Sequence, residues 1–280
     1  MKPKKILSSF LIPVLVFSGC ASSGGTKTQS RPAISAPLAD EVALGEKIHA
    51  QILSSFYPYT EPTAAGYINQ IGASLAAHAR RRNLPYRFTI LYNDKIYATS
   101  SPGGFVYLTT GLIRFLDNES EIAAVMAHEI GELQYQDPRL SQSRKILDAV
   151  TRGGAAVGPA FGSVGALAVL GLMMMNAIAE AGQLTPAQRL HKADAEALHY
   201  MTEAGYDPQG LIDVLYRFLN ADPALVPFFY DYQQSRPITM DRFQALQAEF
   251  DGLPLQGKTF STGRDTYQEM TKGIQEIYRR

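Results

Sequence analysis

The sequence has little of what several common protein classes require. It contains one cysteine, which excludes a disulfide framework and a cysteine-rich zinc module. Its 26 basic and 26 acidic residues give a formal net charge of +0, so it lacks the overall positive charge of most nucleic-acid binders. No Gly-x-Ser-x-Gly motif of a serine hydrolase occurs. We expect neither a nucleic acid nor a nucleotide as a partner, and no serine catalysis.

What is present is typical of a globular protein that follows an export signal. Hydrophobic residues make up 46% and charged residues 19%, and 280 residues are enough for one large domain. At the N-terminus, Lys2, Lys4 and Lys5 precede a mostly apolar run from Ile6 to Phe17. This run is too short to cross roughly 30 Å of hydrocarbon comfortably. It therefore predicts a signal peptide rather than a membrane-spanning helix.

The end of this run resembles the lipobox of bacterial lipoproteins. A small Ser-Gly pair precedes Cys20, and Phe17 stands where the pattern usually has leucine. The resemblance implies a signal peptide over residues 1–19 and a lipid on Cys20 that ties the protein to a membrane. Ala21, in place of an aspartate, resembles lipoproteins that are passed to the outer membrane. We expect a periplasmic protein, lipid-anchored at the outer membrane; a simple N-terminal membrane anchor is the alternative.

Two further segments have unusual composition. Residues 20–39 are rich in Ser, Gly, Thr, Gln, Pro and Ala, which cannot bury enough apolar surface to offset ordering, so we expect a flexible tether before a domain over residues 40–280. Gly153 to Ala179 contains no charged residue. Because glycine and proline interrupt its first half, we expect a buried or cleft-lining hairpin, with a membrane span as the alternative.

Hydrophobic periodicity predicts a mainly helical domain with a small sheet. Alternating strand formers predict strands over residues 87–92 and 105–109. Asn118 and Glu121 form a possible capping box for a helix over about 119–136. The other predicted helices cover residues 42–53, 67–75, 186–204, 209–220 and 265–278.

The helix predicted over residues 119–136 carries the chemistry. Residues 122–132 resemble the zinc-binding helix of the H-E-x-x-H metallopeptidases. In that motif two histidines, four residues apart on one helical face, reach one metal, and the glutamate beside the first polarises the metal-bound water. Here the first pair is His128-Glu129, and Glu132 stands in place of the second histidine.

Other segments extend this resemblance in the same order. They are Ser101–Leu112 before the helix, and Ala193-Asp194 and Ala204–Pro208 after it. Over roughly Asp40 to Phe250 the chain is similar to family forty-eight of the metallopeptidases, which includes the CAAX prenyl endopeptidases and an envelope protease that supervises beta-barrel assembly. The resemblance implies an α+β, mainly helical, zincin-like metallopeptidase domain with a small sheet and a central active-site helix. It implies zinc as the cofactor.

The same resemblance implies that most of the metal site is replaced. The family holds zinc with the two helix histidines and a glutamate four residues before the Ala-Asp aspartate. This chain keeps His128 but has Glu132 and Leu190 at the other two positions. A family histidine in a His-Pro segment corresponds to Arg236, and Arg242 matches a family arginine.

Two interpretations follow. In the first, zinc binds to His128, Glu132 and His191, although His191 is one residue past the family position, about 100° around a helix. Glu129 then activates water, and Arg236 or Arg242 stabilises the oxyanion.

In the second interpretation the metal is lost. One cleft then holds three carboxylates, those of Glu129, Glu132 and Asp194, of which Asp194 lies behind the ligand positions. Arg236 pairs with Glu129 or Glu132 to neutralise them. Because three losses occur together, we favour this interpretation.

Polypeptide binding does not require the metal. Peptidases of this architecture hold extended substrates against the edge of a small sheet. We expect the segment from Gly103 to Leu108 to be that edge. Gly103 and Gly104 permit close backbone approach, and Phe105 and Tyr107 are predicted to form a wall of the cleft or, alternatively, ordinary core. We expect a protein that binds exported or outer-membrane proteins with little or no cutting. The alternative is an active zinc-dependent metalloendopeptidase of envelope protein quality control.

Overall fold

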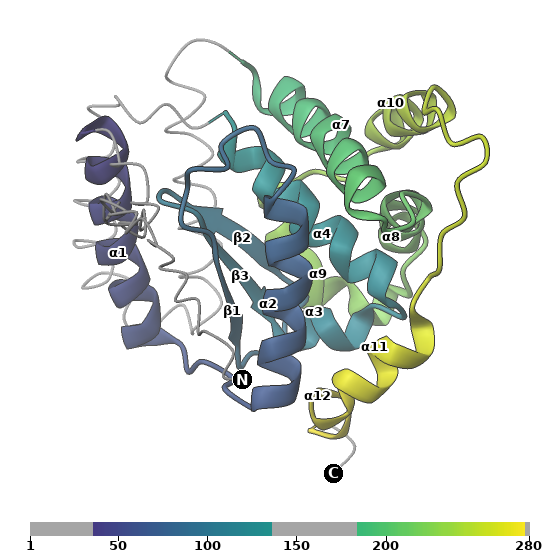
Figure 1. Ribbon diagram of the computed structural model, residues 1–280. Helices are drawn as coiled ribbons and strands as arrows, with labels where there is room; N and C mark the ends of the chain where they lie inside the picture. The colour runs from purple at the N-terminus through teal and green to yellow at the C-terminus, as the bar shows by residue number, and fades with distance from the viewer. Residues whose placement is uncertain (1–35, 136–183, 278–280) are drawn as a thin grey trace, which may run out of the picture. The chain divides into compact units, whose positions relative to one another are not determined.

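The computed structural model describes residues 36–135 and 184–277 (Figure 1). The predicted signal peptide, the lipidation site at Cys20 and the uncharged segment 153–179 lie outside the described residues. Within the two described ranges no helix is both long and apolar enough to cross a membrane. The first helix begins at Ala36, so it includes the last four residues of the segment predicted as a tether.

The described chain is mainly helical with one small sheet, as predicted. The strands are β1 (Arg87–Leu91), β2 (Ala98–Ser101) and β3 (Phe105–Thr109). The helices before and around the sheet are α1 (Ala36–Ser55), α2 (Pro62–Ala76), α3 (Thr110–Phe115) and α4 (Glu119–Leu133). The later helices are α7 (Pro186–Ala204), α8 (Gln209–Leu219), η1 (Pro223–Leu225), α9 (Val226–Ser235), α10 (Met240–Asp251), α11 (Arg264–Met270) and α12 (Lys272–Glu276).

Local capping explains where the two central helices begin and end. The Asn118 side chain accepts a hydrogen bond from the Glu121 backbone N–H at the start of α4, which is one half of the predicted capping box. The Glu121 carboxylate accepts from the Asp117 backbone N–H instead of from that of Asn118, so the box is not complete. A complete capping box at Thr185 starts α7, and Gly205, with φ of +84°, ends it in the left-handed conformation. The predicted bounds of α7 are confirmed. The predicted C-terminal helix is two short helices, which meet at the buried Thr271.

The sheet order corrects one expectation. Its strands lie in the order β1-β3-β2, with β1 parallel and β2 antiparallel to β3. The prediction that the segment from Gly103 to Leu108 lies at a sheet edge is therefore wrong, because β3 is paired on both sides. Gly103 and Gly104, with φ of +84° and +92°, form the turn between β2 and β3. The sequence reading missed β2 because it is short and consists of small residues.

Helices cover both faces of the sheet. Figure 1 shows α1 on one side, and α2 and α4 on the other. On the α1 side, the His49 ring stacks on Phe105 with centroids 4.8 Å apart, and its Nδ1 lies 3.0 Å from the Tyr107 hydroxyl. On the opposite side, Phe88 of β1 packs so closely on Gly72 of α2 that a Cβ at Gly72 would clash with its ring.

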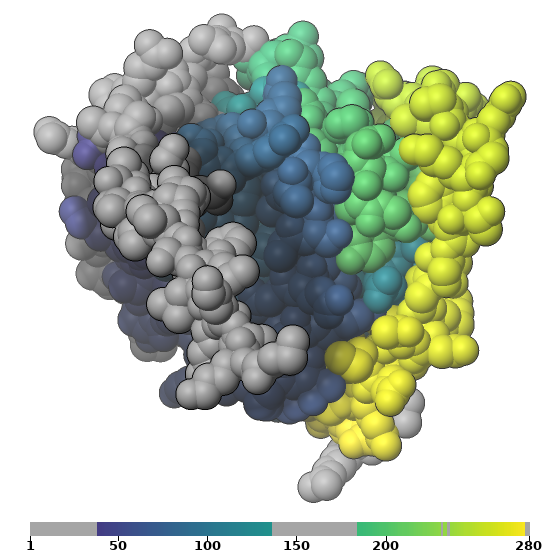
Figure 2. All heavy atoms as spheres, viewed as in Figure 1, coloured from purple at the N-terminus to yellow at the C-terminus, as the bar shows by residue number. Residues whose placement is uncertain are grey.

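The centre of the described structure is α4. Every residue of α4 except Glu119 is buried. On the face drawn in Figure 2, α2, α7 and the C-terminal residues form most of the coloured surface. A Cβ at Gly131 would lie 2.7 Å from the Ala193 carbonyl oxygen, so only glycine lets α7 approach α4 this closely. This close approach brings the polar residues of the two helices together.

Candidate functional site: a buried charge cluster

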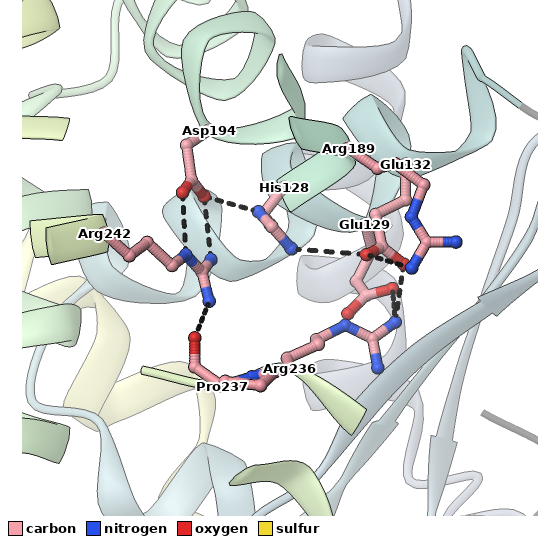
Figure 3. A network of polar contacts seen from close by, with 8 residues as sticks. All are labelled: His128, Glu129, Glu132, Arg189, Asp194, Arg236, Pro237 and Arg242. Carbon is pink, nitrogen blue, oxygen red and sulfur yellow. Dashed lines mark hydrogen bonds and ion pairs between the residues drawn. The ribbon is translucent and has the colours of Figure 1, made fainter. Parts of the chain in front are cut away.

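Four helical segments contribute to one cluster of buried charged side chains (Figure 3). Three members come from α4, two from α7, one from the residue that caps the C-terminal end of α9, and one from α10. None is more than 4% exposed. The members are His128, Glu129, Glu132, Arg189, Asp194, Arg236 and Arg242.

One half of the cluster fixes the orientation of the histidine. His128 Nδ1 lies 2.7 Å from Asp194 Oδ1. Arg242 binds both oxygens of Asp194, through Nε and Nη2, each at 2.8 Å. Burial alone would raise the pKa of Asp194, but Arg242 and His128 outweigh it and hold that pKa below its usual value. Asp194 is therefore an ionised group that holds the His128 imidazole in position through Nδ1.

The other half is built on Arg236. Its Nη2 donates to Glu129 Oε2 and to Glu132 Oε2, both at 2.8 Å. The predicted pairing of Arg236 with one of these glutamates is confirmed, and the arginine contacts both. Because all three side chains are nearly or fully inaccessible to solvent, the pairing is far less screened than a surface ion pair.

A third arginine was not foreseen. Arg189 Nη2 lies 3.9 Å from Glu132 Oε1, and the Arg189 side chain is buried. The only signal in the sequence was its place next to Leu190, the position of the missing third ligand. With Arg189 the cluster holds three carboxylates and three guanidinium groups, apart from His128, so its charges can balance without a metal.

The two glutamates on Arg236 differ in acidity. Burial raises the pKa of Glu129, and Arg236 only partly offsets this effect. Burial also acts on Glu132, but Arg236, Arg189 and His128 outweigh it and lower the pKa of Glu132 to about 2. Glu132 is therefore the firmly ionised partner of Arg236.

The histidine of the cluster and its two glutamates, all on α4, each have one buried atom that makes no hydrogen bond to the described residues. The three atoms are His128 Nε2, Glu129 Oε1 and Glu132 Oε1. His128 Nε2 and Glu132 Oε1 are 3.8 Å apart, too far for a hydrogen bond. These atoms are the polar positions left for a water molecule or another ligand.

The described residues do not fit a catalytic zinc ion, which needs three protein ligands. In residues 36–135 and 184–277 no three His, Cys, Asp or Glu side chains are grouped to hold a metal. Leu190 is buried and offers no donor atom, and His191 is exposed on α7, outside the buried cluster. A guanidinium about 4 Å from a divalent cation repels it by roughly 8 kcal/mol at an effective dielectric constant of about 20.

The residues predicted to bind substrate lie elsewhere. Phe105 and Tyr107 are each 1% exposed and pack under α1, so they are core side chains in this arrangement. The Gly103 N–H donates to the buried carboxylate of Glu41 in α1 at 3.2 Å. A backbone strand cannot be added at β3, and the structure does not bring these residues into the charge cluster.

One sequence motif runs against the expectation that no nucleotide binds. Residues 252–259 read Gly-Leu-Pro-Leu-Gln-Gly-Lys-Thr, which has the spacing of a phosphate-binding P-loop. A P-loop joins a strand to the helix that follows it, but this segment follows α10 and is separated from α11 by residues 260–263. The Lys258 ammonium lies 3.9 Å from Glu203 of α7. The structural context of a nucleotide site is missing here.

Comparison with known proteins places this arrangement in context. The model of "Peptidase family M48" matches residues 62–250, which is more than half of the chain. The matched range contains every member of the charge cluster.

Several curated proteins are similar over the same region. The "Beta-barrel assembly-enhancing protease" of Escherichia coli (strain K12) is 28% identical over 197 residues, which are 65% of this chain and 38% of that protein. The protein of the same name from Yersinia pestis is 28% identical over 227 residues, 75% of this chain and 45% of its own. The chain thus spans less than half the length of these relatives.

Proposed function

Because the chain belongs to peptidase family M48, we propose that it is a lipid-anchored protein of the cell envelope that binds extended polypeptide, and in which peptide hydrolysis is weak or lost. The family acts on polypeptide, and the relatives' names connect them to beta-barrel assembly. By analogy, exported or outer-membrane proteins are the clients, and a lipid on Cys20 holds the protein at the periplasmic face of the outer membrane.

The observation that carries the loss of hydrolysis is the contact of Arg236 with both glutamates. In a zinc peptidase, the carboxylate beside the first histidine must accept a proton from water. Here Glu129 Oε2 already accepts a hydrogen bond from Arg236, and burial raises the pKa of Glu129. The permanently charged guanidinium of Arg236 is thus hydrogen-bonded to both carboxylates that metal binding and water activation would need.

The sheet edge at which a polypeptide binds is β2 and not β3. Among the described residues β2 pairs only with β3, so its other side is a sheet edge. The segment around Tyr57 and Tyr59 already makes backbone hydrogen bonds along the outer side of β1. The Tyr59 N–H donates to the Ile90 carbonyl, and the Tyr92 N–H donates to the Tyr57 carbonyl. All four residues of β2 are buried, so strand addition there requires neighbouring segments to move.

One observation favours the alternative, an active zinc-dependent metalloendopeptidase with an altered site. Two tetrahedral zinc ligands at bond lengths of 2.0–2.1 Å lie about 3.3 Å apart. The unbonded atoms His128 Nε2 and Glu132 Oε1 are 3.8 Å apart, and Asp194 holds the histidine as a supporting residue does in metal sites. This function needs a third ligand and the displacement of Arg236.

The deciding experiment measures zinc per chain and cutting of denatured casein by the purified protein. We expect no stoichiometric zinc after incubation with excess metal, and no difference in cutting between wild type and Glu129→Gln. Glu121→Gln is the matched control, because Glu121 is also a buried glutamate of α4 that contacts an arginine. One zinc per chain, lost in His128→Ala, together with cutting that is lost only in Glu129→Gln, would establish the alternative.

A further inference from the structure

A second concave site lies apart from the charge cluster. It is a cavity of about 610 Å³, bounded by the loop after β1, by α3, by α8, by η1 and by the start of α9. This volume is in the range of sites that bind small molecules or a few residues of a peptide. None of its lining residues belongs to the cluster around Arg236.

Part of the cavity wall is apolar, and a cation lies beside each of its two aromatic side chains. Phe115 and Phe228 both line it. The Arg217 guanidinium lies 5.7 Å from the centroid of Phe115, and the Lys95 ammonium lies 5.4 Å from that of Phe228. Lys95 Nζ also donates to the Pro227 carbonyl at 2.7 Å, which holds it beside the ring. The arrangement offers apolar surface next to positive charge.

The charged side chains that line the cavity are two arginines and one aspartate. Arg114 and Arg217 line the cavity, and Asp94 is the acidic residue among its lining. Arg217 contacts Asp117 and Glu121, neither of which lines the cavity, through the single nitrogen Nη2. Its buried Nε makes no hydrogen bond to a described residue. A guanidinium with unused donors beside apolar walls suits an oxygen anion on an apolar group.

We infer that this cavity binds a monoanion: a carboxylate carried by an apolar or aromatic group. A dianionic phosphate fits less well, because Asp94 and the two carboxylates on Arg217 would repel its second charge. The same chemistry occurs at the free C-terminus of a polypeptide that ends in an apolar residue, and in a free aliphatic acid. The inference does not depend on whether the protein hydrolyses peptides.

The test is calorimetric titration of the purified protein with three probes: N-acetyl-Gly-Phe, its C-terminal amide, and octanoate. We expect N-acetyl-Gly-Phe to bind at least about tenfold more tightly than its amide, because a charged hydrogen bond is lost with the carboxylate. Arg114→Glu should weaken binding of the acid by about tenfold or more. Arg82→Glu is the matched control, an exposed arginine that does not line the cavity, and should bind as wild type does.

The outcomes separate the two sources and can overturn the inference. Tighter binding of N-acetyl-Gly-Phe assigns the site to a polypeptide C-terminus, and tighter binding of octanoate assigns it to a free acid. Phe228→Ser, a change at a partly exposed residue, should weaken either ligand several-fold by removing apolar contact. Equal binding of the acid and the amide, no effect of Arg114→Glu, or no binding of any acid would overturn it.

Discussion

Two arginines of this protein make the same contact in different surroundings. Arg236 and Arg217 each bring one Nη2 to two carboxylates, at distances between 2.6 and 2.8 Å. The Arg236 side chain is 2% exposed, whereas that of Arg217 is 30% exposed and one of its partners, Asp117, is 41% exposed. The geometry is alike, so differences in behaviour come from solvent and from further charges.

The acidity of the glutamates shows what those surroundings do. Burial raises the pKa of Glu121, and the half-exposed Arg217 does not reverse the effect. Burial acts on Glu132 as well, but the buried Arg236 and Arg189 reverse it and lower the pKa to about 2. An ion pair seen in a structure therefore does not by itself say which way a carboxylate shifts. The number and burial of the cations decide this.

The largest effect should come from removing each arginine in turn. Arg236→Met leaves two buried carboxylates without their shared partner, so we expect the free energy of unfolding to fall by about 3–5 kcal/mol. Arg217→Met should lower it by only about 1–2 kcal/mol, because solvent screens Arg217 and Asp117. Urea denaturation at neutral pH measures both. Equal losses would mean that burial does not distinguish the two pairs.

The two glutamates on Arg236 should respond to pH with opposite sign. The folded pKa of Glu129 is raised, so its contribution to stability is full below the unfolded pKa and is lost as pH rises through the folded value. Relative to wild type, Glu129→Gln should therefore gain stability as pH rises above 4.5, the ordinary pKa of a glutamate. The folded pKa of Glu132 is about 2, so its contribution is present above the unfolded value and is lost as pH falls toward 2.

Glu132→Gln should consequently be most destabilised, relative to wild type, at neutral pH, and the difference should shrink below about pH 4.5. Denaturation curves of the three proteins across this range measure both slopes. If the two variants follow wild type with the same slope, Arg236 does not distinguish its partners.

A smaller effect tests the packing that assembles the cluster. Gly131→Ala places a methyl group 2.7 Å from the Ala193 carbonyl oxygen, so we expect a loss of about 1–3 kcal/mol and a shift of α7 away from α4. Gly66→Ala, in the exposed part of α2 with no atom within 4 Å of the new Cβ, should gain about 0.5–1 kcal/mol. Thermal unfolding compares the two. A gain in both variants would show that α4 and α7 have room to separate.

Much of the local structure follows from the sequence. The helices that carry the cluster have clear signals, such as the capping box at Thr185, the glycine stop at Gly205 and the cap at Asn118. The motif around His128 also indicated the family and the replaced ligands. Arg236 was predicted to meet a glutamate because charge balance in a buried site requires a cation when no metal is present. These inferences depend on neighbours along the chain or on simple electrostatics.

The tertiary structure decided what depends on segments far apart in the sequence. The pairing of β2 made β3 an inner strand, and α1 turned Phe105 and Tyr107 into core residues. Rotation about the axis of α7 placed Arg189 in the cluster and His191 in solvent. The residue types alone did not distinguish these outcomes, because a histidine or an arginine on a helix can point either way. The packing of neighbouring helices fixes the direction, and here it gives the buried glutamates arginine partners.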